Sequence, residues 1–181
     1  MIELVIFDLD GTLVDTFDAN FTAYEKACNL KGFTITREQY SKVYGLSWKD
    51  AIPRLTNITD MNIAKEVHEL KNKYYPHCLA LVKPISNTIN LKNLLKSKYR
   101  LCIGTSASRE NVEAVLKATK LEEDFEFVVA SEDVQRGKPE PDIFLRCAEL
   151  AKVMPQDCFV IEDSEAGIMA AKNAGMSYFK I

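Results

Sequence analysis

Apolar and polar residues divide this chain into segments of two kinds. Short runs of β-branched, aromatic and aliphatic residues, most of them followed at once by Asp, Glu, Ser or Thr, alternate with longer segments in which apolar residues recur every three or four positions. The short runs predict buried strands, and the periodic segments predict amphipathic helices. The predicted strands are residues 4–7, 99–104, 126–130, 158–161 and 177–181.

From residue 84 onward, each predicted strand is preceded or followed by a predicted helix. The helical faces contain Leu91, Leu94 and Leu95; Val112, Val115 and Leu116; Ile143, Phe144, Cys147 and Ala148; and Ile168, Ala171 and Ala174. Ser108 stands where an N-cap is expected, and Gly175 where a helix should stop. This alternation is typical of a parallel α/β sheet, to which the first strand also belongs.

Residues 15–83 contain helical patterns and no convincing strand. Their predicted buried faces are Phe17, Phe21, Tyr24 and Cys28, then Ile63, Val67, Leu70 and Tyr74, with a further helix over 36–55 interrupted near Gly45. The block is too long to be a simple crossover between parallel strands. It therefore predicts an inserted all-helical cap (15–83), with residues 1–14 and 84–181 forming the α/β core.

Composition narrows the class of protein. The chain has 181 residues, of which 47% are hydrophobic and 27% charged, with a net charge of −3. These values are typical of a soluble globular protein and argue against nucleic acid or an anionic membrane as a partner. Apolar runs are too short for a signal peptide or a spanning helix, and the five cysteines form no CxxC pair. We expect free thiols and a cytoplasmic location.

Polar side chains gather where the predicted strands end. Asp8 and Asp10 follow the first strand, Ser106 and Ser108 the second, and Glu162 and Asp163 the fourth, while Lys138 lies in a Pro-rich loop. The carboxyl ends of parallel strands meet at one edge of a sheet, so these groups should converge. Several carboxylates in one place favour a divalent cation, and oxygen ligands favour Mg²⁺. The sequence therefore predicts a site that handles phosphate.

Four of these segments resemble the motifs of the haloacid dehalogenase (HAD) superfamily, in the family's order and across essentially the whole chain. They are Asp8-Leu9-Asp10-Gly11-Thr12, Ser106 after a strand, Lys138 in Gly137-Lys138-Pro139-Glu140-Pro141-Asp142, and Glu162-Asp163-Ser164. The nearest likeness is to the beta-phosphoglucomutase and phosphoglycolate phosphatase branch. The resemblance implies a Rossmann-like core with a helical cap that closes over it and excludes water.

The resemblance also implies a role for each motif residue. Asp8 is expected to attack phosphorus and form an aspartyl-phosphate, with Asp10 as general acid and base. Asp8, the Asp10 backbone carbonyl and Asp163 are expected to bind Mg²⁺, supported by Glu162. Ser106, Ala107 and Lys138 are expected to hold the phosphoryl group, although Thr105 is an alternative to Ser106. Gly11 should allow close backbone approach, and Thr12 should position its neighbours.

In the cap, Tyr44-Gly45-Leu46-Ser47-Trp48-Lys49 falls where the family has its substrate-specificity loop. One interpretation is that Gly45, Trp48 and Lys49 contact the substrate. The other is that Trp48 packs within the cap and Lys49 is solvated. His68 and His77 are interpreted as surface or structural residues.

Two departures from the mutase branch favour hydrolysis, because Asn20 and Trp48 replace the His and Arg that the branch typically has. Dehalogenation is disfavoured by the presence of Asp10 and Glu162-Asp163. We expect a Mg²⁺-dependent phosphatase acting on a small phosphorylated metabolite. The alternatives are a phosphomutase and a catalytically silent binding module. The oligomeric state is left open. The chain ends at Ile181, where the resembling proteins continue, so we expect a short sheet edge or one covered by another chain.

Overall fold

A computed structural model describes residues 1–181, and it contains a five-stranded parallel sheet. The strands are β1 (Leu4–Phe7), β4 (Arg100–Gly104), β5 (Val128–Val129), β6 (Cys158–Glu162) and β7 (Ser177–Lys180), arranged in the order β5-β4-β1-β6-β7. The apolar segment at the start of the chain is therefore the central strand. Its register places Phe7 between Ile103 of β4 and Ile161 of β6. The predicted α/β fold is confirmed.

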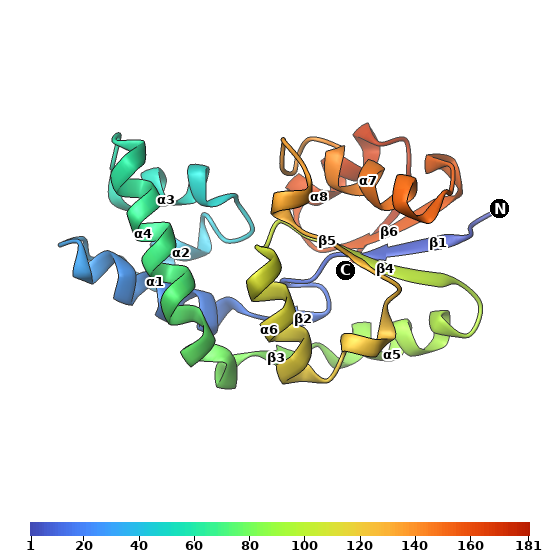
Figure 1. Cartoon of the computed structure of the whole chain (residues 1–181), viewed down its shortest axis with the longest axis horizontal. Coiled ribbons are helices and arrows are strands. Elements are labelled where there is room, and N and C mark those ends of the chain that lie inside the picture. Colours follow the sequence, from blue (N-terminus) through green and yellow to red (C-terminus); the bar gives the residue numbers. More distant parts are fainter. The chain divides into compact units, whose positions relative to one another are not determined.

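Helices cover both faces of this sheet, as the alternating pattern predicts. Figure 1 shows α7 and α8 on one side and α5 and α6 on the other. Their bounds are α5 (Ser86–Lys96), α6 (Arg109–Thr119), α7 (Asp142–Ala151) and α8 (Glu165–Asn173). The short 3-10 turns η2 (Glu122–Asp124), η3 (Ser131–Asp133) and η4 (Pro155–Asp157) complete the connections. Two covered faces explain why β1 is apolar at every position.

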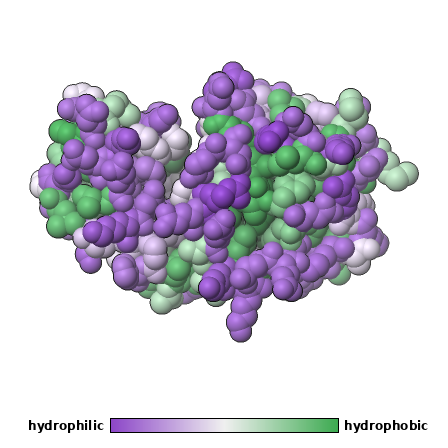
Figure 2. All heavy atoms as spheres, viewed as in Figure 1, coloured by the Kyte–Doolittle hydropathy of each residue, from purple (hydrophilic) through white to green (hydrophobic).

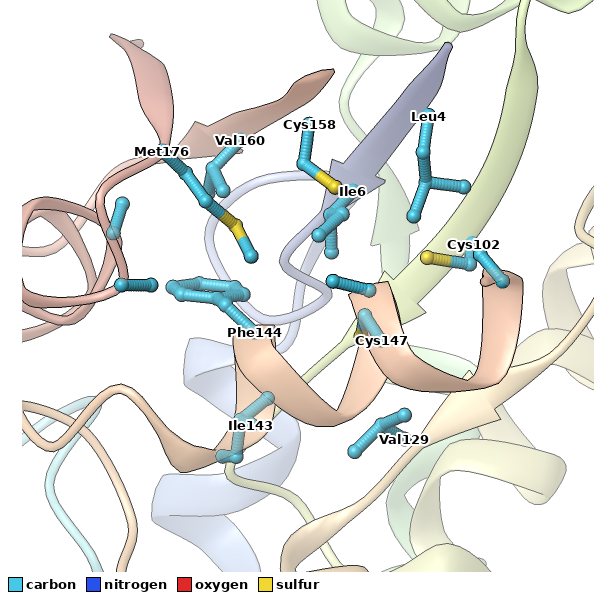
Figure 3. Close-up of a cluster of buried hydrophobic side chains, with 14 of the residues drawn as sticks. Leu4, Ile6, Cys102, Val129, Ile143, Phe144, Cys147, Cys158, Val160 and Met176 are labelled. Atoms are coloured by element: carbon cyan, nitrogen blue, oxygen red, sulfur yellow. The ribbon is translucent and has the colours of Figure 1, made fainter. Parts of the chain in front are cut away.

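The main core lies between the sheet and α7 with α8 (Figure 3). Leu4 and Ile6 of β1 and Val160 of β6 meet Phe144 and Cys147 of α7 there, all of them fully buried. Side chains alternate along a strand, so Val5 and Phe7 face the other side, where the Phe7 ring contacts Phe125 edge to face with centroids 5.9 Å apart. These contacts on both faces hold β1 in place within the sheet.

The second unit is helical and has its own core. It contains α1 (Phe17–Leu30), α2 (Arg37–Ser41), α3 (Trp48–Thr56), α4 (Met61–Tyr74) and the 3-10 segment η1 (Tyr75–Leu81). Thr36 and Gln39 form a capping box at α2, and the Asp60 side chain caps α4. Tyr40 lies at the centre of an aromatic cluster, with ring centroids 5.2–5.9 Å from those of Phe17, Phe21, Tyr24 and Tyr44. Pro53 lies inside α3.

The two compact units consist of residues 1–15 with 83–181, and residues 16–82. Each boundary differs by one residue from the sequence-based one. The reason is a short antiparallel pair, β2 (Val14–Asp15) with β3 (Lys83–Pro84), where the chain leaves the core and returns to it. Asp15 and Lys83 are therefore strand residues, and the helical unit begins and ends one residue inside the predicted bounds.

On two helices the buried face differs from the predicted one. In α5, Leu94 is 71% exposed, whereas Lys92 is buried and pairs with Asp124 of η2. In α4, Ile63 is exposed, whereas Lys71 is buried with its ammonium 4.2 Å from the centre of the Tyr75 ring. A long basic side chain can bury its stem while its charge finds a carboxylate or an aromatic face. Periodicity of apolar residues does not detect such positions.

Two local expectations in the core also failed. Ser108 precedes α6, but its side chain makes no capping hydrogen bond; the Arg109 amide donates to the Glu132 carboxylate at 3.1 Å instead. The predicted strand 126–130 shortens to β5, because only Val128 and Val129 pair regularly with β4. The acceptor for the Arg109 amide comes from Glu132 of η3, a separate segment, and a pattern along α6 cannot show it.

Hydrophilic residues cover most of the face seen in Figure 2. The outer strand β7 is exposed along its whole length, with Phe179 51% exposed. This edge of the sheet is uncovered in the structure. No helix is long and apolar enough to cross a membrane.

We predict that Lys92→Met lowers the melting temperature more than Lys96→Met. Both ammonium groups contact Asp124, but the Lys92 side chain is 3% exposed and that of Lys96 48%. Exposed pairs contribute about 0–1 kcal/mol, whereas breaking a buried pair costs about 3–5 kcal/mol, less here because Asp124 keeps its second lysine. Thermal unfolding followed by circular dichroism measures both variants. Equal decreases in melting temperature would show that the burial of Lys92 does not affect the stability of the fold.

Candidate active site

Asp8 begins the site, at the first position after the central strand. Its amide donates to the Ile161 carbonyl at 3.0 Å, which continues the β1–β6 ladder by one residue. The Asp8 side chain is 8% exposed and the Glu162 side chain, level with it at the end of β6, is 1% exposed. Two buried carboxylates at the same height on neighbouring strands require compensating charge.

Lys138 supplies part of that charge. Its ammonium lies 2.5 Å from Asp8 Oδ1 and 3.0 Å from Glu162 Oε2, and its side chain is 4% exposed. It also lies 4.8 Å above the centre of the Phe144 ring. Burial by itself lowers the pKa of this lysine, but the carboxylates of Asp8 and Glu162 outweigh burial and raise its pKa above the ordinary value. Lys138 is therefore charged and bridges two strand ends.

Glu162 is fully hydrogen-bonded. Its Oε1 accepts from the Asp163 amide, the Ser164 amide and the Ser164 hydroxyl, each at 3.0 Å, while Oε2 accepts from Lys138. The same Ser164 hydroxyl accepts from the Gly167 amide and caps α8. Burial by itself raises the pKa of Glu162, but Lys138 and the Ser164 donors outweigh burial, so the pKa lies below its ordinary value. Glu162 is an ionised support for its neighbours.

Asp163 lies beside the turn that follows β1. The Thr12 hydroxyl, fully buried, donates to Asp163 Oδ1 at 2.9 Å. Gly11 has φ +86°, and a Cβ at that position would lie 2.4 Å from Asp163 Oδ2. Gly11 is thus required for both its backbone conformation and the space it leaves. Burial raises the pKa of Asp163 to about 6, with the Thr12 hydroxyl opposing and Glu162 adding to the rise.

The charges at this edge do not balance. Burial raises the pKa of Asp8 well above its ordinary value; Lys138 opposes this, and the nearby Glu162 and Asp10 add to it. Asp8, Glu162 and Asp163 each offer an oxygen within 4.8 Å of the others, against one lysine. A divalent cation would supply the missing positive charge, and an all-oxygen donor set suits Mg²⁺. These residues therefore fit a magnesium ion.

Asp10 lies outside this carboxylate cluster. It is half-buried in the turn between β1 and β2, where the Gly11 amide donates to the Val14 carbonyl at 2.8 Å. Asp8 is buried and contacts Lys138, whereas Asp10 is half-buried and close enough for its charge to raise the pKa of Asp8. Their unequal surroundings suit unequal chemical roles.

At the end of β4, the three candidate phosphate-binding positions differ. Thr105 is buried, and its hydroxyl accepts the Ala107 amide at 3.1 Å. The Ala107 amide is thus already hydrogen-bonded. Ser106 is half-buried. The Thr105 hydroxyl accepts this bond and keeps its own hydrogen to donate, so Thr105 and Ser106 both remain candidates for the phosphate-binding hydroxyl.

In the helical unit, Gly45 adopts φ +84° and Trp48 begins α3. The Trp48 ring stacks on His68, with centroids 4.8 Å apart and planes 10° apart. Lys49 is exposed, with its ammonium 5.8 Å from the centre of the Trp48 ring. The stacking supports the interpretation that Trp48 packs within the cap, and it gives His68 a structural role.

Two residues of the site were missed by the sequence analysis. Phe144 was assigned to the core, and nothing in its helical spacing indicates that its ring also contacts Lys138. Gly167 was not singled out, although a glycine inside a helix is a weak signal, since it costs helix stability. Its position beside Glu162 is visible only in the folded chain.

We predict that Asp163→Asn raises the melting temperature of the metal-free protein at pH 8. The native pKa of Asp163, about 6, exceeds the value near 3.8 of an unperturbed carboxyl. The native state therefore keeps a proton that the unfolded chain has released, and stability falls as the pH rises through this window. Allowing for the partial exposure of Asp163, we expect a gain of about 2–4 °C.

Thermal unfolding in a chelator measures this gain, which should shrink as the pH is lowered through 6. Asparagine keeps the oxygen that accepts from Thr12, so the comparison isolates the charge. A gain that is the same at every pH would show that the ionisation of Asp163 is not its cause. Added Mg²⁺ should raise the melting temperature of the wild type and not that of the variant.

Comparisons with known proteins agree with this arrangement. The family model of haloacid dehalogenase-like hydrolases matches residues 5–181. The chain is 32% identical over 180 residues to a phosphorylated carbohydrates phosphatase of Thermotoga maritima, covering 96% of this chain and 82% of that protein. It is 31% identical to the beta-phosphoglucomutase of Bacillus subtilis, covering 95% and 80%.

Among solved structures, CbbY from Rhodobacter sphaeroides in complex with phosphate superposes with a TM-score of 0.86 at 28% identity, covering 98% of this chain and 85% of that one. Sequence and structure therefore show that the chain belongs to the haloacid dehalogenase-like hydrolase family.

Proposed function

We propose that this protein is a Mg²⁺-dependent phosphatase that hydrolyses a small phosphorylated metabolite through an aspartyl-phosphate on Asp8. The observation that carries the proposal is the buried group of Asp8, Lys138 and Glu162 with Asp163 beside it. Burying these charges is costly, and a merely structural ion pair does not need a second and third carboxylate nearby.

In the proposed reaction, Asp8 attacks the phosphorus atom, and the bond from phosphorus to the alcohol oxygen breaks. Asp10 donates a proton to that oxygen. It then accepts a proton from water, which attacks the aspartyl-phosphate and releases inorganic phosphate. General acid–base help of this kind contributes about 10²–10⁴-fold. Asp8 is buried beside Lys138 whereas Asp10 is half-buried, and this difference in surroundings supports Asp10 as the proton carrier and Asp8 as the nucleophile.

Asp8, Asp163 and the backbone carbonyl of Asp10 are the proposed Mg²⁺ ligands, with Glu162 supporting them. When bound, the ion supplies positive charge to the phosphoryl oxygens. Lys138 neutralises charge beside Asp8, and we assign Ser106, with the Ala107 amide, to the phosphoryl group. The hydrogen bond between the Ala107 amide and Thr105 must then be shared or exchanged when phosphate binds.

The relatives indicate the substrate class. One is named for phosphorylated carbohydrates and another is a beta-phosphoglucomutase, so a sugar phosphate is our first candidate. Mutase activity is a second candidate because of the latter relative. Two positions in the helical unit argue for hydrolysis, because Asn20 and Trp48 stand where the mutase branch typically has His and Arg. Asn20 donates to the Thr16 hydroxyl at 3.1 Å, and Trp48 stacks on His68. Both side chains are engaged within that unit.

We predict that purified protein with Mg²⁺ releases inorganic phosphate from at least one sugar phosphate in a metabolite screen. Asp8→Asn should lower kcat by about 10³-fold or more, because amide nitrogen and oxygen are poor nucleophiles toward phosphorus. Asp18→Asn, on the exposed surface of α1, is the matched control and should keep wild-type activity. Hydrolysis that survives Asp8→Asn, or complete chelation of metal, would refute the mechanism.

The mutase alternative makes a different prediction for products. With a hexose 1-phosphate and a catalytic amount of hexose bisphosphate, a mutase yields the isomeric monophosphate, whereas a phosphatase yields free sugar and phosphate. We expect free sugar and inorganic phosphate, with the appearance of inorganic phosphate and of any isomeric monophosphate followed by phosphorus NMR over the time course. Accumulation of the isomer at a rate above that of phosphate release would favour the mutase.

A further inference from the structure

Gly167 is the third residue of α8 and lies directly behind the carboxylate of Glu162. It is buried, and its amide donates to the Ser164 hydroxyl, which in turn donates to Glu162 Oε1. These two hydrogen bonds connect Gly167 to Glu162 through Ser164, the residue that caps α8. Nothing in the proposed reaction uses Gly167 directly.

Backbone conformation does not explain this glycine. Gly167 is absent from the residues with positive φ, which include Gly11, Gly32, Gly45 and Gly175. Within a helix alanine is the more favourable residue, by about 1 kcal/mol. By local rules the position should therefore be alanine, like its neighbours Ala166, Ala170 and Ala171.

Space does explain it. A Cβ added to Gly167 would lie 1.4 Å from Oε2, 2.0 Å from Cδ and 2.6 Å from Cγ of Glu162. Nonbonded carbon and oxygen atoms cannot approach so closely, so the carboxylate would have to leave its position. It is the movable partner, because the backbone at Gly167 is fixed by the helix.

The position that Glu162 would lose is the one that organises the site. There its two oxygens accept four hydrogen bonds, including the one from Lys138, and Lys138 in turn contacts Asp8. We propose that Gly167 is a positioning residue: its missing side chain provides the space in which the Glu162 carboxylate holds Lys138 against Asp8. The catalytic part of this inference rests on the proposed function; the steric part does not.

A double-mutant cycle of Gly167→Ala with Glu162→Ala tests the inference. In the wild-type background, Gly167→Ala should lower the melting temperature, because Glu162 and Lys138 lose their contacts. In the Glu162→Ala background the obstacle is gone, and the same change should raise the melting temperature by about 2–4 °C through helix propensity. This reversal of sign is the expected result, measured by thermal unfolding in a chelator.

Gly137→Ala is the matched control. Gly137 precedes Lys138, lacks positive φ, and has no atom within 4 Å of the position of a Cβ. The melting temperature of this variant should stay at or slightly above that of the wild type. If Glu162→Ala does not fold, Glu162→Asp replaces it, because a carboxylate one methylene shorter should reduce the cost of Gly167→Ala. A cost that is the same in every background would overturn the proposal.

Activity gives a second, separate readout. Gly167→Ala should lower kcat/KM by about 10–100-fold, as expected when a group that orients a metal or nucleophile is displaced. Combined with Glu162→Ala, it should cause no further loss. Losses that multiply would show that Gly167 acts independently of Glu162 and would overturn the positioning role. If the wild type hydrolyses no phosphate ester, the proposed function fails, while the unfolding cycle still decides the steric inference.

Discussion

One ammonium group, that of Lys138, lies between two carboxylates that belong to neighbouring strands. Asp8 follows β1 and Glu162 ends β6, so their side chains lie side by side, both buried, at the carboxyl ends of two neighbouring parallel strands. Without a positive charge between them, two ionised carboxylates in that position would repel each other in a medium of low dielectric constant. The site therefore depends on a lysine delivered from a loop 130 residues away from Asp8.

One positive charge is not enough for the acids around it. Burial raises the pKa of Asp8 and of Asp163, neighbouring carboxylates add to the rise, and a bound cation would lower both pKa values. The folded chain thus holds acidic groups in a state that is unfavourable by itself and that a divalent cation, in our proposal Mg²⁺, would make favourable. Such a cost to the stability of the folded chain is common at functional sites.

Close packing around the carboxylates, like the charge of Lys138, holds these side chains in position. Gly11 and Gly167 each stand where a side chain would collide with a carboxylate, of Asp163 and of Glu162 respectively. The first also needs a glycine for its backbone, and the second does not. Small residues and a buried ammonium together hold each acid in a single place, which proximity effects in catalysis require.

The sequence by itself determined the α/β fold, because strands covered on both faces must be apolar throughout and helices between them must be amphipathic. It also predicted a site at Asp8, Asp10, Lys138, Glu162 and Asp163, because the carboxyl ends of parallel strands meet at one edge, and the structure brings Asp8, Lys138, Glu162 and Asp163 together. Only the tertiary structure decided where buried charge replaces apolar contact, as at Lys92 and Lys71, and which acceptor satisfies the start of α6. It also revealed the steric relation of Gly167 to Glu162. These features depend on partners from other segments, and a pattern along one segment contains no information about what packs against it.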